Sequence, residues 1–252
     1  MKPIHTIEDV IAVLQGIIDE SIAQKSPLGY FAALYQKVTI QVKEGIENNF
    51  FDDGPRMEKL DIIFAKRYID AYYEFQANRP TTQSWEKAFL LSFNFWPIVL
   101  QHLLIGMNAH INLDLGIAAA EVMEGKPIED LKDDFNKINT ILSSLVSDVE
   151  QNLSRIWPFL KKILKFTRKV DNFLVDFSME VARDGAWKFA VKLANTPEEN
   201  IAETIHLRDE SVAKIASLIT NPGVIANIIF GIIRLGERGT VPHKIKKLMH
   251  TP

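Results

Sequence analysis

The sequence predicts an all-α fold, a compact bundle of about nine or ten helices. Apolar residues recur at three- and four-residue spacing through nearly the whole chain of 252 residues. No stretch alternates apolar and polar residues as a half-buried strand does. Short Gly- and Pro-containing breaks separate the periodic stretches. Long helices with short connections are typical of a helical bundle and not of an α/β enzyme fold.

Helix boundaries in the first half follow from capping residues. Thr6 and Asp53 are expected N-caps, and Pro55 lies near the first position of the helix that Asp53 caps. Gly125 is expected to end the central helix. The expected helices span residues 6–23, 30–47, 56–77, 82–93 and 97–123.

The second half is expected to continue in the same way. Thr196-Pro197-Glu198-Glu199 is a strong helix start, with an N-cap, a proline and acids in the first turn. The expected helices span residues 127–155, 159–170, 171–194, 196–220 and 224–235. We expect a single domain over 1–252, with its softest internal boundary at 157–158 and a basic tail at 236–252.

Composition excludes several classes of protein. With no cysteine, the chain has no disulfide, no cysteine-ligated zinc and no cysteine nucleophile. The pI of 6.1 argues against a nucleic-acid-binding domain. Walker, dinucleotide-binding, G-x-S-x-G and H-E-x-x-H motifs are all missing. No secretory signal is visible at the start, so a cytoplasmic location is the default expectation.

Charge and hydropathy raise the question of a membrane. Residues 1–150 contain 13 Lys and Arg against 22 acids, and residues 151–252 contain 16 against 10. Such asymmetry indicates either halves that attract each other or a basic surface. The basic amphipathic stretch 159–170 is expected to pack one face on the core, with a membrane-surface helix as the alternative. Residues 224–235 are too short to cross a bilayer, so no transmembrane segment is predicted. They are expected to form a core helix, with a membrane-surface or partner-binding helix as the alternative.

The central stretch from Gln101 to Glu121 is apolar but contains several polar groups. Buried polar groups need hydrogen bonds, charge partners or a metal. His110 and Asp114 are four residues apart and share a helix face, at a spacing that suits zinc, iron or manganese. His102 is eight residues before His110, about 12 Å away along a straight helix, so it would serve a second ion or act through another ligand.

Further ligands would have to come from other helices. The candidates are His102, Asp61 or Asp70, and Asp133 or Asp134. The alternative is a structural network without metal, in which His110 bonds Asp114 and the asparagines tie helix backbones together.

Arg67 and Asn108 are the candidate substrate-binding residues. Arg67 would hold an anionic group among the tyrosines of its helix. The alternative is an ordinary ion pair between Arg67 and Asp70, which are three residues apart.

Three segments resemble an uncharacterised helical family, domain of unknown function 5995. They are FFDDGPRMEKLDIIFAKRYIDAY, LQHLLIGMNAHINLDLGIAAA and KDDFNKINTIL, and the resemblance covers about residues 25–220. It implies a helical fold and no particular activity.

The chain is also weakly similar to the helical group of zinc-dependent phospholipase C and P1-type nuclease, which cleave phosphoester bonds. His110 and Asp114 match one H-x-x-x-D pair of that group. At the other pair, Gly106 replaces the carboxylate that would follow His102, and Met1 offers no equivalent of the N-terminal ligand. The resemblance therefore implies at most a reduced site with one or two ions.

These observations leave three functions open. The first is a metal-assisted hydrolase of a phosphoester or similar small substrate, with a metal-bound hydroxide as nucleophile. The metal ligands would come from His102, His110, Asp114 and Asp61, and Arg67 and Asn108 would bind substrate. The alternative is a non-catalytic helical binding protein whose interior pocket would hold an apolar or amphipathic small-molecule ligand. A third possibility is a peripheral membrane or partner-binding protein acting through 159–170 and the basic tail.

Overall fold

The computed structural model describes residues 3–138, 140–142, 156 and 179–249. Within these residues the chain is helical and contains no strand, so the predicted all-α class is confirmed. The elements are α1 (Ile7–Gln24), α2 (Gly29–Glu47), α3 (Gly54–Gln76), α4 (Gln83–Leu90), η1 (Leu91–Phe93), α5 (Val99–Ala109), η2 (His110–Asp114), α6 (Leu115–Val122), η3 (Ile128–Leu131), α10 (Met179–Ala194), α11 (Glu198–Thr220), α12 (Val224–Gly236) and α13 (Val241–Met249).

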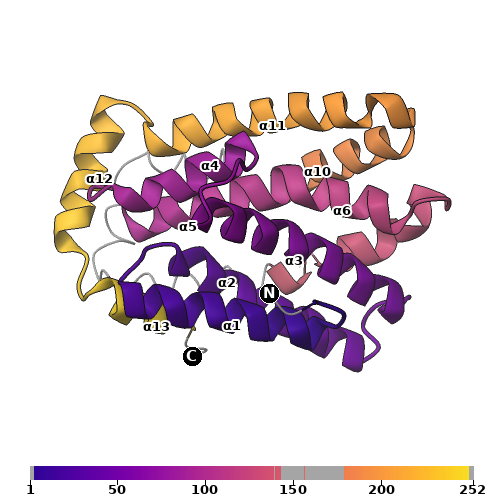
Figure 1. Cartoon of the computed structure of the whole chain (residues 1–252), viewed down its shortest axis with the longest axis horizontal. Coiled ribbons are helices and arrows are strands. Elements are labelled where there is room, and N and C mark those ends of the chain that lie inside the picture. The colour runs from indigo at the N-terminus through magenta and orange to yellow at the C-terminus, as the bar shows by residue number, and fades with distance from the viewer. Residues whose placement is uncertain (1–2, 139, 143–155, 157–178, 250–252) are drawn as a thin grey trace.

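The segment α5–η2–α6 runs through the middle of the bundle (Figure 1). Helices α1 and α2 form one side with α3, and α11 covers the opposite side. Helix α10 packs on α6, and α4 lies between α5 and α11. Helix α12 crosses one end of the molecule and connects α11 to α13, which packs on α2 and α1.

The starts of α1 and α3 follow the sequence, but that of α11 does not: its N-cap is Pro197 and not Thr196, whose hydroxyl donates instead to the Lys192 carbonyl. Thr6 accepts a hydrogen bond from the Asp9 N–H, and the Asp9 carboxylate accepts from the Thr6 N–H, which completes the capping box of α1. Asp53 caps α3 through the Arg56 N–H, as predicted. Helix α4 is capped from a distance, because the Asp209 carboxylate on α11 accepts the N–H groups of Gln83 and Ser84.

The central segment Val99–Val122 is apolar and long enough to span a membrane, but 89% of its most apolar window is buried inside the bundle. Its glycines permit close packing. A Cβ at Gly106 would lie 2.5 Å from the Phe31 ring, and one at Gly116 would lie 2.7 Å from the Phe189 ring. Small residues at these positions let α2 and α10 approach the central segment closely.

The C-terminal elements differ from expectation. Residues 224–235, expected as a core helix, form α12, which buries only Ala226, Phe230 and Ile233. The expected basic tail contains α13, because Ile245 and Leu248 supply an apolar face that packs on the bundle. The expected boundary at 157–158 and the basic stretch 159–170 lie outside the described residues.

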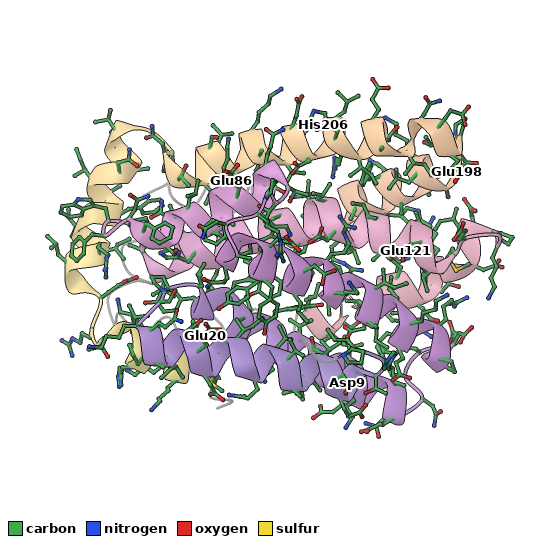
Figure 2. The ribbon with its side chains drawn as sticks, in the orientation of Figure 1. Asp9, Glu20, Glu86, Glu121, Glu198 and His206 are labelled. Carbon is green, nitrogen blue, oxygen red and sulfur yellow. The ribbon has the colours of Figure 1, made fainter. Side chains whose placement is uncertain are left out.

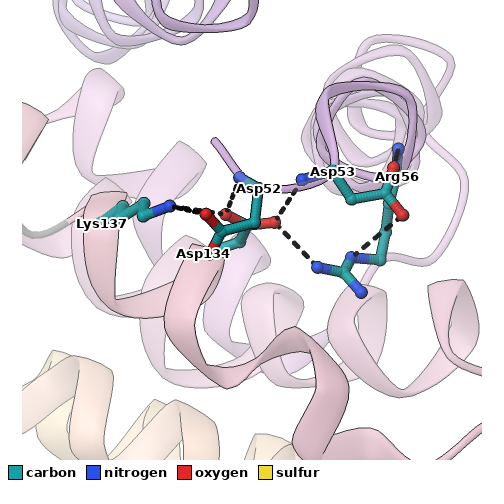
Figure 3. A network of polar contacts seen from close by, with 5 residues as sticks. All are labelled: Asp52, Asp53, Arg56, Asp134 and Lys137. Carbon is teal, nitrogen blue, oxygen red and sulfur yellow. Dashed lines mark hydrogen bonds and ion pairs between the residues drawn. The ribbon is translucent and has the colours of Figure 1, made fainter. Parts of the chain in front are cut away.

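A buried carboxylate fixes the connection between α2 and α3 (Figure 3). Asp134, which follows η3, accepts the N–H groups of Asp52 at 2.6 Å and Asp53 at 3.0 Å. The Arg56 Nη2 donates to the same carboxylate at 2.8 Å, and Lys137 lies at 3.5 Å. This network ties three parts of the chain together at one fully buried side chain.

Candidate functional site

A buried cluster of polar and aromatic side chains surrounds the turn η2 in the middle of the bundle. We call it the interior site. Its members are Tyr35 on α2, Asp61 and Arg67 on α3, Trp85 on α4, and His110 and Asp114 on η2.

The turn η2, His110–Asp114, is a π-helix. Such turns are rare inside α-helices and are frequent at functional sites. The wider turn changes the backbone hydrogen bonding, and the Asn112 carbonyl accepts a hydrogen bond of 2.8 Å from Arg208 Nε on α11. Arg208 thus supports the irregular backbone that presents His110 and Asp114.

Asp114 is fully buried and accepts hydrogen bonds at both carboxylate oxygens. Arg67 Nε donates to Oδ1 at 2.9 Å, and Trp85 Nε1 donates to Oδ2 at 2.8 Å. His110 Nδ1 lies 3.1 Å from Oδ2. Residues from α3, α4 and η2 therefore meet at one carboxylate, and the His110–Asp114 contact has the predicted spacing.

The contact with Asp114 determines which ring nitrogen of His110 carries the proton. Burial lowers the pKa of His110 below its ordinary value, although Asp114 acts in the opposite direction. The neutral ring therefore carries one proton, and that proton lies on Nδ1 because the facing carboxylate oxygens only accept. Nε2 is left as an acceptor. It is buried and has no hydrogen-bond partner among the described residues.

Aromatic rings hold the His110 ring in place. Phe64 stacks on it with centroids 3.6 Å apart and an angle of 7° between planes. The Tyr35 ring meets it edge to face at 4.4 Å. Phe31, Tyr68 and Trp85 also contact it. The imidazole therefore has little freedom to rotate.

Two further buried polar atoms of the interior site, on Tyr35 and Asp61, lack partners. The Tyr35 hydroxyl and Asp61 Oδ2 are buried and make no hydrogen bond within the described part of the chain. Burial raises the pKa of Tyr35 well above its ordinary value, and the nearby Asp61 and Asp114 carboxylates add to the shift. Burial and the charge of Glu58 raise the pKa of Asp61 to about 8, so Asp61 is mostly protonated at neutral pH. Unsatisfied buried polar groups are costly, and these three, which belong to residues linked through Tyr35, require an explanation.

His102 does not join the interior site. It lies against the Tyr30 ring at 5.5 Å. Burial, together with the positive charges of Arg234 and Lys244, lowers the pKa of His102 to about 3. It therefore belongs to a different environment, near α12 and α13.

The other candidates also occupy separate places. The exposed Asp70 pairs with Lys66, so the expected Arg67–Asp70 pair is replaced by Arg67–Asp114. Asp134 belongs to the network in Figure 3. Asn108 uses both ends of its amide, donating to the Val212 carbonyl at 3.0 Å and accepting from Asn112 at 3.1 Å.

Among the described residues, no group of three or more His, Asp or Glu side chains is arranged to hold a metal ion. Of the predicted site residues, the structure brings together His110, Asp114 and Arg67, with Asp61 close to Tyr35. Sequence reasoning missed Tyr35 and Trp85. Both lie in apolar helical patterns that indicate core packing; the buried carboxylate of Asp114 signals the need for a donor such as Trp85, and no sequence signal points to Tyr35.

Comparison with known proteins identifies the family of this chain but gives no activity for it. The model of a family of unknown function, DUF5995, matches residues 7–222. No curated protein and no solved structure matches the chain. The resemblance to the zinc-dependent phospholipase C and P1-type nuclease group is not confirmed by these comparisons. Because the family match covers most of the sequence, the chain belongs to the DUF5995 family of unknown function.

Proposed function

We propose that the protein binds a small polar ligand at the interior site, with His110 Nε2 as the principal hydrogen-bond acceptor. The observation that carries the proposal is the set of unpartnered buried atoms on Tyr35, Asp61 and His110. Buried polar groups are normally satisfied, and exceptions need a ligand, an ordered water or a functional reason. A ligand with its own donors and acceptors would satisfy all three.

The residues around His110 have separate roles in the proposed site. Asp114 holds the imidazole in the tautomer that leaves Nε2 bare, and Trp85 and Arg67 in turn hold Asp114. The Arg67 side chain is 27% exposed, so it is the part of this group that solvent reaches. It is the residue proposed to meet an anionic part of the ligand. Asn108, whose amide is already used at both ends, is assigned to helix contact instead.

Metal-assisted phosphoester hydrolysis is the second candidate. A histidine that binds a metal commonly donates its other N–H to a carboxylate, and His110 and Asp114 have that relation. His110 Nε2 has a free lone pair for a metal, and Asp61 could be a second ligand once it loses its proton, since neither atom has a hydrogen-bond partner among the described residues. Asp114 is better suited to orienting His110 than to ligation, because the Arg67 cation already lies 2.9 Å from Oδ1. No three-residue ligand group occurs in the described part, so binding without metal ranks first.

Native mass spectrometry and elemental analysis of the purified full chain test both candidates. We expect a small molecule to remain bound to the wild type and to be lost from His110→Gln and Tyr35→Phe. His206→Gln is the matched control, since this histidine is exposed on α11, and it should keep the ligand. A metal ion bound to the wild type and lost only from His110→Gln would instead favour the second candidate.

The stability of the same variants distinguishes a site that binds a ligand from side chains that only pack the core. Tyr35→Phe removes a buried hydroxyl that has no partner, so in ligand-free protein it should be neutral or slightly stabilising. If the wild type holds neither a small molecule nor a metal, and neither a fragment library nor zinc, iron or manganese raises its melting temperature, both candidates are wrong. The open atoms would then be satisfied by water.

A further inference from the structure

Helix α12 presents an apolar face to solvent. Val224 is 77% exposed, Ile228 is 60% exposed and Leu235 is 74% exposed. We call this surface the α12 apolar face. Its members are Val224, Ile225, Ile228, Ile232 and Leu235.

The face is a continuous stripe. At 100° per residue, its five members fall within about 100° of the helix circumference. Ala226, Phe230 and Ile233 fall on the opposite side and are buried against the bundle. Aliphatic side chains aligned on the solvent side of a surface helix indicate an interaction site and not ordinary scatter of exposed residues.

Two exposed aromatic residues lie near α12. Phe95 and Trp96, in the connection between η1 and α5, are 63% and 61% exposed. Arg234 of α12 fixes that connection, because its Nε donates to the Phe95 carbonyl at 2.6 Å. Its guanidinium also lies 4.6 Å from the centroid of the Phe95 ring. The aliphatic stripe and the two aromatic side chains therefore belong to one end of the molecule.

Within the described residues 221–249, the exposed charges are positive. Residues 221–252 contain five Lys and Arg residues and a single acid, Glu237. The Glu237 side chain is only 5% exposed and pairs with Lys244 at 2.6 Å and Arg234 at 3.3 Å. Arg238 and Lys246 are exposed. Of the labelled acids in Figure 2, Asp9, Glu121 and Glu198 lie toward the opposite end of the molecule from α12, whereas Glu20 and Glu86 lie in the half nearer to it.

We propose that the α12 apolar face, with Phe95 and Trp96, docks on the surface of an anionic lipid bilayer. Helix α12 has 13 residues and is about 20 Å long, too short to cross a hydrocarbon core of about 30 Å. An amphipathic helix with cationic neighbours lies in the plane of such a surface and inserts its apolar face. Tryptophan is favoured at the same depth. A second copy of the chain is a poorer partner, because self-association would bring two cationic borders together.

Sedimentation with lipid vesicles tests the proposal. We expect the full chain to sediment with vesicles of phosphatidylcholine and phosphatidylserine, and to stay in the supernatant with phosphatidylcholine alone. The double variant Ile228→Ser, Ile232→Ser should partition at least about tenfold more weakly, because it loses two inserted aliphatic side chains. High salt should also weaken binding, because the cationic border is screened.

The control is Leu207→Ser, a similar change at a residue that is 53% exposed on α11. It should sediment like the wild type, and circular dichroism should show that every variant keeps its helices. Wild-type protein that stays in the supernatant with anionic vesicles overturns the proposal, as does a double variant that binds them equally well. A dimer in analytical ultracentrifugation that the double variant abolishes, without vesicle binding, would assign the face to self-association.

Discussion

Replacing Asp114 by alanine is expected to reduce the free energy of unfolding by about 3–5 kcal/mol, the cost of removing one partner of a buried charge network. The change leaves Arg67, Trp85 and His110 without their shared acceptor. Both Trp85 and His110 are buried, so water does not readily replace the lost bonds. Urea unfolding followed by circular dichroism measures the effect.

Asp70→Ala is the matched control for this prediction. Asp70 is also an aspartate in an ion pair, but its partner is Lys66 and both side chains are exposed. We expect a change within about 0.5 kcal/mol, as is usual for surface substitutions. Equal effects of the two variants would show that Asp114 is not the centre of the interior site.

Asp134→Ala is expected to cost about 2–4 kcal/mol, because the side chain is fully buried and accepts three charged or backbone donors. Its neighbour Asp133 is exposed, so Asp133→Ala should have little effect. Thermal unfolding of the two variants beside the wild type makes the comparison.

The Asp134 network also predicts a pH dependence. Burial acts to raise the pKa of Asp134, but the N–H groups of Asp52 and Asp53 and the Arg56 guanidinium lower it below the ordinary value of 3.8. A lowered pKa means that the contribution to stability is present above the ordinary value and is lost as pH falls through the folded pKa. The stability difference between the wild type and Asp134→Ala should therefore shrink below about pH 4. A difference that grows on acidification would contradict this assignment.

The sequence predicts where helices begin and end better than it predicts which residues contact one another across helices. Capping residues such as Thr6 and Asp53 act locally, and both start their helices as expected. Asp209, which caps α4 from α11, lies 125 residues from Ser84, and no local pattern connects them. Helix α13 was missed because Pro and Gly interrupt a short basic stretch whose apolar face becomes evident only against α2 and α1.

The same limit applies to the interior site. The His110–Asp114 contact follows from helical spacing, and the structure has it. Arg67 has a nearer acid in sequence, Asp70, so spacing alone selects the wrong partner. The π-turn has no sequence pattern of its own, because the length of one helical turn depends on the surrounding packing, and contacts such as that of Arg208 with the Asn112 carbonyl come from elements distant in sequence.

The most direct test of the interior site is the protonation state of His110. Nuclear magnetic resonance of protein labelled with nitrogen-15 in its histidines reports both ring nitrogens, and His110→Gln assigns the signals. We predict a neutral ring at pH 7, with the proton on Nδ1 and a bare Nε2, since burial lowers the pKa and Asp114 accepts from Nδ1. A proton on Nε2, or a doubly protonated ring at pH 7, would contradict the account, because Nε2 could then not act as the acceptor for a ligand.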